Sequence, residues 1–221
     1  MKSSPFRKYG FAELLVLLIS LFIIAPFTEK GGVSQIFLLG VFFLAVINAT
    51  YLISKSKRVL YRCLFLAIPT IIFHILDAFI VNKYIEVATI LFSLAFISFI
   101  IVMMVSSLFL LKKVSYNIIL SAIIVYILLG IAWAFMYAFI DIIHPNSFAV
   151  HFASQPLERI DGDSIYDYFY YSFVVLCTVG FGDVTPFSPL AKSFSILEAI
   201  TAQIYLTVII ARLVGMHISK R

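Results

Sequence analysis

The sequence predicts an all-α membrane protein with six transmembrane helices and one re-entrant helix. The composition supports this: 63% of the 221 residues are hydrophobic and only 12% are charged. The mean hydropathy is +1.10. A soluble helical bundle needs a charged outer surface, which so few charged residues cannot provide. Most of the apolar surface must therefore face lipid or neighbouring helices.

Six apolar stretches are long enough to be compared with the roughly 20 residues that cross a bilayer core of about 30 Å. The first follows Lys2, Arg7 and Lys8, as in a signal peptide, but no small-residue cleavage site follows it. We therefore expect it to be a retained span. The stretches cover approximately residues 11–27, 33–53, 59–81, 87–111, 118–143 and 190–217.

The basic residues predict the orientation, because Lys and Arg accumulate in short loops on the cytoplasmic side. With the N-terminus inside, 12 of the 16 basic residues are cytoplasmic, and we expect both termini there. Their scatter at the ends of apolar runs does not indicate nucleic-acid binding. The cytoplasmic set is Lys2, Arg7, Lys8, Lys55, Lys57, Arg58, Arg62, Lys112, Lys113, Arg212, Lys220 and Arg221, and the external set is Lys30, Lys83, Arg159 and Lys192.

The connection between the fifth and sixth stretches contains an apolar run that is too short to span. Ser164 and Asp167 form a Ser-x-x-Asp capping pattern, which predicts a helix over residues 164–176. About 13 residues at 1.5 Å each reach roughly 19 Å, little more than half the hydrocarbon, so the chain must turn back. Irregular backbone at that depth is tolerated only where it is buried in protein or lines a watery path, and this arrangement indicates a pore.

The segment after this helix reads Thr-Val-Gly-Phe-Gly-Asp and ends at Asp183. Glycine adopts positive φ readily, so successive backbone carbonyls can turn toward one axis. Rings of such carbonyls replace the water shell of a dehydrated potassium ion. The predicted ion sites use the carbonyls of Thr178, Val179, Gly180 and Phe181, with the Thr178 hydroxyl at the inner end.

The helix before this segment is strongly aromatic. Its C-terminus, aimed at the pore centre, would place a partial charge of about −0.5 there and favour a cation. The aromatic side chains would form a collar that braces the segment against widening. They are Tyr166, Tyr168, Phe169, Tyr170, Tyr171 and Phe173.

Residues 168–186, YFYYSFVVLCTVGFGDVTP, resemble the pore loop of the tetrameric potassium-channel superfamily, close to its small prokaryotic members. The resemblance covers about residues 118–213 as outer helix, pore helix, filter and inner helix, and gives domains 1–113 and 114–221. It implies a homotetramer that conducts K⁺ passively through the filter, in contact with the lipids of a prokaryotic plasma membrane. An enzyme is not expected, since no nucleophile, base and orienting group occur together.

Three residues depart from the pattern of that superfamily. Phe181 replaces a common Tyr, which removes a hydroxyl that could tie the filter to the pore helix. Val174 stands where some relatives carry Glu, which removes one proton-dependent link to Asp183. Ala202 stands where many inner helices carry a hinge Gly, which weakens the case for a sharply bending gate.

The last apolar stretch carries further candidates. Gln203, Leu206 and Ile210 share a helix face that could line the inner cavity, and plain helix packing is the alternative. Glu198 either hydrogen-bonds behind the filter, pairs with Lys192, or is an exposed acid. The predicted filter-support residues are Gly182, Asp183, Tyr170, Tyr171, Val174, Cys177 and Glu198.

The first four stretches carry no comparable motif. Residues 87–111 contain no Lys or Arg, and moving one charge through 100 mV is worth roughly 2.3 kcal/mol, so we expect little intrinsic voltage gating. His74 and Asp77 can share a helix face as a buried pair or a proton sensor. We expect no cytoplasmic ligand-binding domain after the last stretch. Two rival functions are a pore that also passes sodium and a non-conducting auxiliary subunit.

Overall fold

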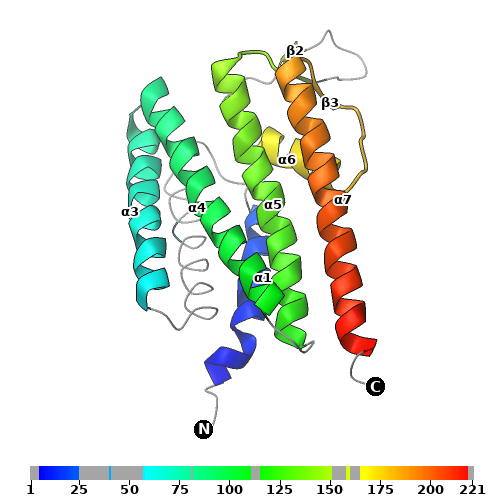
Figure 1. The fold of residues 1–221 in the computed structure, drawn as a ribbon. Helices are drawn as coiled ribbons and strands as arrows, with labels where there is room; N and C mark the ends of the chain where they lie inside the picture. The colour runs from blue at the N-terminus through cyan, green and yellow to red at the C-terminus, as the bar shows by residue number, and fades with distance from the viewer. Residues whose placement is uncertain are drawn as a thin grey trace. The chain divides into compact units, whose positions relative to one another are not determined.

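The structure is a computed structural model that describes residues 5–24, 40, 57–80, 82–110, 115–150, 158–159 and 165–218. Contacts divide the chain into two compact units, residues 1–128 with 216–221, and residues 129–215, so the two boundaries fall within two helices. The helices of the described part are α1 (Pro5–Ile24), α3 (Lys57–Phe79), α4 (Lys83–Leu110), α5 (Tyr116–Ile143), α6 (Ile165–Leu176) and α7 (Pro189–Ile218) (Figure 1).

Four of these helices are long and apolar enough to cross a membrane: Arg58–Phe79, Lys83–Phe109, Tyr116–Ile143 and Pro189–Met216. They correspond to the third, fourth, fifth and sixth predicted stretches. The first stretch overlaps α1, whose apolar part, Gly10–Ser20, is shorter than a span. The second stretch, 33–53, lies outside the described residues except for residue 40. Six transmembrane helices therefore stay a prediction.

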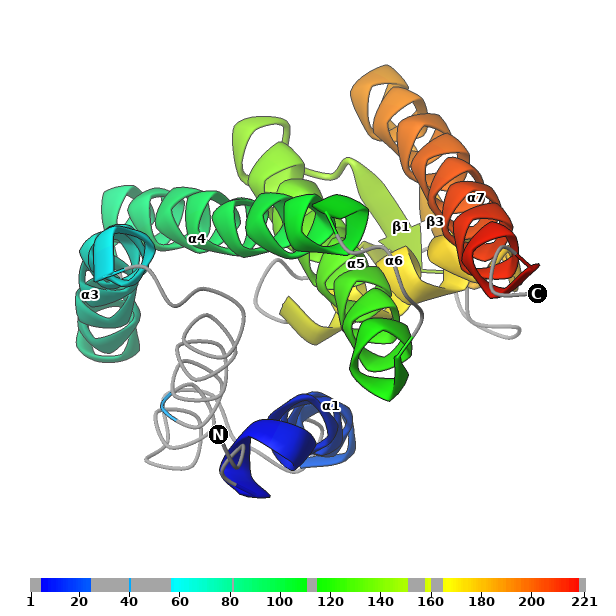
Figure 2. The same ribbon diagram turned by 60° about the horizontal axis from the view of Figure 1, so that its bottom comes forward.

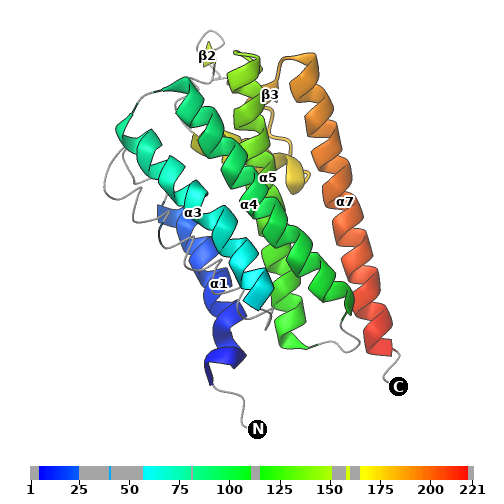
Figure 3. The same cartoon turned by 60° about the vertical axis from the view of Figure 1, so that its left-hand side comes forward.

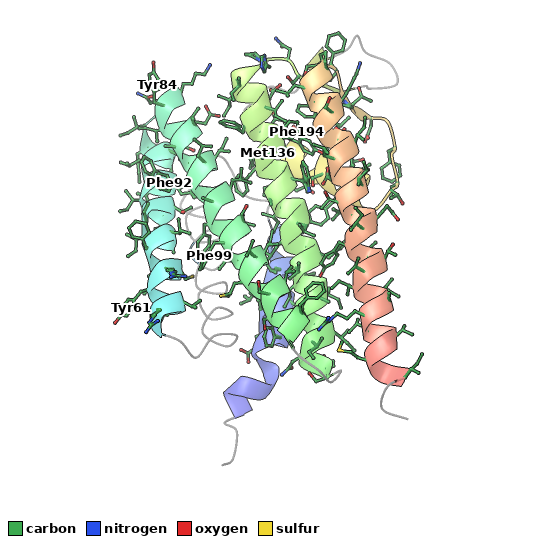
Figure 4. All side chains as sticks on the ribbon, in the orientation of Figure 1. Tyr61, Tyr84, Phe92, Phe99, Met136 and Phe194 are labelled. Carbon is green, nitrogen blue, oxygen red and sulfur yellow. The ribbon has the colours of Figure 1, made fainter. Side chains whose placement is uncertain are left out.

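In the first unit, α3 and α4 pack side by side through small polar groups and one aromatic pair. Phe73 and Phe92 stack with ring centroids 5.0 Å apart, and Phe92 lies on the α3 side of its helix (Figure 4). The Thr89 hydroxyl donates to the Phe73 carbonyl at 3.2 Å, and His74 Nε2 lies 2.9 Å from Ser93 Oγ. His74 thus meets α4, and no hydrogen bond joins it to the predicted partner Asp77 in the described part of the chain.

The second unit contains a small antiparallel sheet that the all-α prediction missed. Its strands are β1 (Phe148–Val150), β2 (Glu158–Arg159) and β3 (Val184–Pro186), in the order β2-β1-β3. In Figure 2, β1 and β3 are seen beside α6. Strands of two or three residues are too short to show an alternating pattern, so the sequence carries no signal for them.

Local sequence explains how α7 begins after this sheet. The Ser188 hydroxyl accepts a hydrogen bond from the Ala191 backbone N–H at 3.1 Å, which caps the helix N-terminus. Pro189 occupies the first helical position, where its missing N–H costs nothing and its fixed φ suits a helix. The chain between the end of α6 and the start of α7 is therefore bounded by two defined helix ends.

Candidate functional site

The candidate site begins where α6 ends. The N–H of Thr178 donates to the carbonyl of Val175 at 2.9 Å, and the N–H of Val179 donates to that of Val174 at 3.0 Å. These two bonds form a Schellman motif, which places Thr178 at the first position beyond the helix cap, in the left-handed conformation. Its φ of 58° agrees with this assignment. The helix therefore stops abruptly and sends the chain into the Thr-Val-Gly-Phe-Gly segment.

Thr178 is an unusual residue for that position, which glycine normally occupies. A β-branched residue with positive φ is an outlier, and such backbone strain costs about 1–3 kcal/mol. Sequence reasoning selected Thr178 for its backbone carbonyl and its hydroxyl. It missed the position of Thr178 at the helix end, because a helix end of this type is usually signalled by glycine.

Positive φ recurs at every second residue of the segment. Gly180 has φ 60° and Gly182 has φ 79°. Val179 and Phe181, the residues that alternate with them, do not have positive φ. Successive carbonyls of an ordinary strand point to opposite sides, and reversing the sign of φ at alternate residues allows them to point the same way. A Cβ on either glycine would meet no atom within 4 Å, so backbone conformation, not space, requires glycine.

The side chains of the segment are open in the single chain. Val179 is 50% exposed and Phe181 is 69% exposed, and Cys177 just before the segment is exposed as well. Val174 on α6 is half-buried behind them. The segment therefore exposes apolar side chains in the single chain.

The far end of the segment is fastened by Asp183. The Tyr170 hydroxyl of α6 donates to Asp183 Oδ2 at 2.5 Å, and the Val184 N–H donates to Oδ1 at 2.9 Å. The Tyr170 bond, followed by the backbone bond, lowers the pKa of Asp183, and the same contact raises the pKa of Tyr170. Tyr170 thus supplies a link to Asp183 that Val174 cannot make, and sequence reasoning had not assigned it this role.

The strand that follows Asp183 is tied to α5. Val184 of β3 pairs with Val150 of β1, and β1 begins five residues after the end of α5 at Ile143. Asp141, near that helix end, accepts from the Ser147 N–H at 2.7 Å and from the Tyr168 hydroxyl at 2.8 Å. Sequence reasoning missed Asp141, since an isolated acid at a helix end gives no motif.

The aromatic collar divides into buried and exposed members. Tyr168 and Tyr171 are buried, and the ring of Phe148 lies 5.6 Å and 5.3 Å from them, edge to face. Tyr166 is 39% exposed. The collar is therefore completed by Phe148 of the sheet, which the sequence did not indicate as a neighbour.

Glu198 lies behind α6 and is fully buried. Figure 1 shows α6 between α5 and α7, and in Figure 3 α6 passes behind α5. The Tyr137 hydroxyl of α5 donates to Glu198 Oε2, and Ser172 Oγ of α6 lies 2.5 Å from Oε1. Lys192 is exposed and forms no ion pair with Glu198 in this unit's described residues. Glu198 is therefore not an exposed acid, and it hydrogen-bonds to α5 and α6.

The three predicted cavity residues lie on α7 with different exposure. Gln203 and Ile210 are exposed, Leu206 is half-buried, and Ala202 is fully buried. None of them contacts the segment in a hydrogen bond of the described chain. No group of three or more His, Cys, Asp or Glu able to hold a metal ion occurs within residues that the structure describes.

Comparison with known protein families finds a match in the C-terminal part of the chain. Residues 142–218 match the model of a family described as "Ion channel". This region contains the candidate segment, α6 and α7, and a family of ion channels is not a family of enzymes. Searches of curated proteins and of solved structures returned no match.

Proposed function

We propose that the chain is one subunit of a homotetrameric potassium-selective channel, in which residues 178–181 hold permeant K⁺ through their backbone carbonyls and the Thr178 hydroxyl. The ion-channel family match over residues 142–218 supports the class of function. The observation that carries the proposal is positive φ at Thr178, Gly180 and Gly182, because alternating backbone conformation is what aligns successive carbonyls along one side.

Exposure of the segment supports assembly from several copies. Val179 and Phe181 are half or more exposed, and one chain contributes only one row of carbonyls. Potassium filters complete each ion site with carbonyls from four identical segments. Four copies around one axis would cover the exposed side chains and close the ring at the same time.

The rest of the proposal follows from the predicted topology. The protein lies in the plasma membrane of a prokaryote with both termini cytoplasmic, so Asp183 and the sheet face outward and Thr178 faces the inner cavity. α4 carries Lys83 and Glu86 near its first turn and no other charge, which supports little intrinsic voltage gating. Gln203 and Ile210 on the exposed side of α7 are then candidates for the cavity wall.

Purified protein reconstituted alone in liposomes tests the function. We expect potassium efflux that barium blocks, and a bi-ionic reversal potential that favours potassium over sodium. Equal permeation of sodium would support a non-selective cation pore of the same architecture. No flux from a correctly assembled sample would support an auxiliary subunit and contradict the proposal.

A further inference from the structure

The contacts around Glu198 contain more hydrogen bonds than hydroxyl protons. Three close oxygen pairs occur: Tyr137 hydroxyl to Glu198 Oε2, Ser172 Oγ to Glu198 Oε1 at 2.5 Å, and Ser172 Oγ to the Gly130 carbonyl at 2.8 Å. A hydroxyl carries one proton. Tyr137 and Ser172 together supply two protons for three contacts.

An ionised Glu198 leaves one contact without a proton. The Ser172 proton would then point either at Glu198 Oε1 or at the Gly130 carbonyl, and the other pair would be two acceptors facing each other. A neutral Glu198 resolves the count. Its own proton on Oε1 goes to Ser172 Oγ, the Ser172 proton goes to Gly130, and the Tyr137 proton goes to Oε2.

The described surroundings of Glu198 show no ion-pair partner that would favour its ionised form. Its titratable neighbours are Tyr137 from α5 and Tyr171 from α6, and Tyr171 is engaged with Ser195 at 2.6 Å. No described Lys, Arg or His forms an ion pair with it. A buried carboxylate without a cation is costly, whereas a neutral acid with all its hydrogen bonds made is not.

We infer that Glu198 carries a proton and acts as a positioning residue, completing a hydrogen-bond chain from α7 through Ser172 of α6 to the α5 backbone at Gly130. α6 ends in the Schellman motif that starts the candidate filter. Holding α6 in place through Ser172 therefore also holds the residue at which that segment begins. This role rests on the proposed function. The proton itself does not depend on that function and can be tested separately.

Infrared difference spectroscopy between the intact protein and a Glu198→Gln variant tests the proton directly. We expect the carbonyl stretch of a protonated carboxylic acid in the unmodified protein at neutral pH, lost in Glu198→Gln. Glu86→Gln on α4 is the matched control and keeps that band. A difference spectrum that contains only carboxylate bands overturns the inference, whether or not the protein conducts.

Flux measurements test the positioning role. Gln can donate to Ser172 and accept from Tyr137, so Glu198→Gln retains potassium flux and selectivity, whereas Glu198→Ala lowers flux about tenfold. Ser172→Ala, which breaks the same chain with a smaller cavity, gives the second reading if Glu198→Ala fails to fold. Loss of selectivity in a folded Glu198→Gln variant contradicts the inference.

The dependence of potassium flux on pH shows whether the role of Glu198 depends on its proton or is merely structural. Flux through the unmodified protein declines when alkaline pH removes the Glu198 proton, while Glu198→Gln stays flat over the same range. Tyr137 and Tyr171 are present in both proteins, so their titration cancels in the comparison. Identical profiles overturn the proton-dependent role.

Discussion

The candidate filter, residues 178–182, differs in exposure and in hydrogen bonding from the cluster of Glu198, Tyr137 and Ser172. Residues 178–182 are exposed and have positive φ at alternate positions, which strains Thr178 but not the two glycines. Their proposed role depends on backbone atoms. Glu198, Tyr137 and Ser172 are buried and are satisfied by side-chain hydrogen bonds within one chain. In the proposed tetramer other copies complete the candidate filter, whereas the hydrogen bonds of Glu198 are formed within one chain. Changes in the first region should alter selectivity, and changes in the second should alter stability and flux together.

The largest effect is expected from Gly180→Ala. Alanine at positive φ costs about 1–2 kcal/mol, too little to unfold the chain, but the segment can escape that strain by leaving the alternating conformation. We expect potassium selectivity to be abolished while the assembled protein keeps its size on a sizing column. Unchanged selectivity would contradict the assignment of the filter.

Gly130→Ala tests the close contact between α5 and α6. A Cβ there would lie 2.6 Å from the Phe173 ring, and such overpacking costs about 1–3 kcal/mol. We expect a lower unfolding temperature in detergent and reduced flux, both restored by adding Phe173→Leu. Gly215→Ala, where nothing lies within 4 Å, is the matched control and should not destabilise the protein.

Tyr170→Phe tests the hydrogen bond from the Tyr170 hydroxyl to Asp183. The Tyr170 hydroxyl is the main cause of the lowered pKa of Asp183. The hydrogen bond between them therefore stabilises the protein at pH values above the ordinary carboxyl pKa. This stabilisation is lost as the pH falls through the lowered pKa of Asp183. Removing the hydroxyl raises that pKa, and acid inactivation should begin at a higher external pH than in the unmodified protein. Tyr166→Phe is the control. If the pH at which flux is lost in acid does not shift, the hydrogen bond between Tyr170 and Asp183 does not affect conduction.

The smallest effect is expected from Thr178→Gly. Glycine suits the position after the helix cap, so the variant should be more stable by about 1 kcal/mol. Loss of the hydroxyl should nevertheless weaken the innermost ion site and lower the ratio of potassium to sodium permeability. Thr178→Ser keeps the hydroxyl and should keep the ratio. A stabilised Thr178→Gly with full selectivity would show that the threonine has no functional role.

The sequence predicted features that depend on neighbouring residues, and it did not predict contacts between residues far apart in the chain. The long apolar stretches predicted α3, α4, α5 and α7 to within a few residues, and the Ser164 capping pattern predicted α6. Alternating glycines identified the segment. The β1–β3 pairing joins residues 34–38 positions apart, and Asp141 bonds to residues 6 and 27 positions away. A single sequence gives no signal for such contacts. Glu198 was recognised as a candidate, but its partners on two other helices required the structure.

The most direct test of the central claim is the position of thallium, an anomalous scatterer that replaces potassium, in crystals of the assembled protein. We predict anomalous peaks on the symmetry axis between the carbonyls of Thr178, Val179, Gly180 and Phe181, and their loss in Gly180→Ala. Peaks elsewhere in the pore with none at these carbonyls would contradict the account.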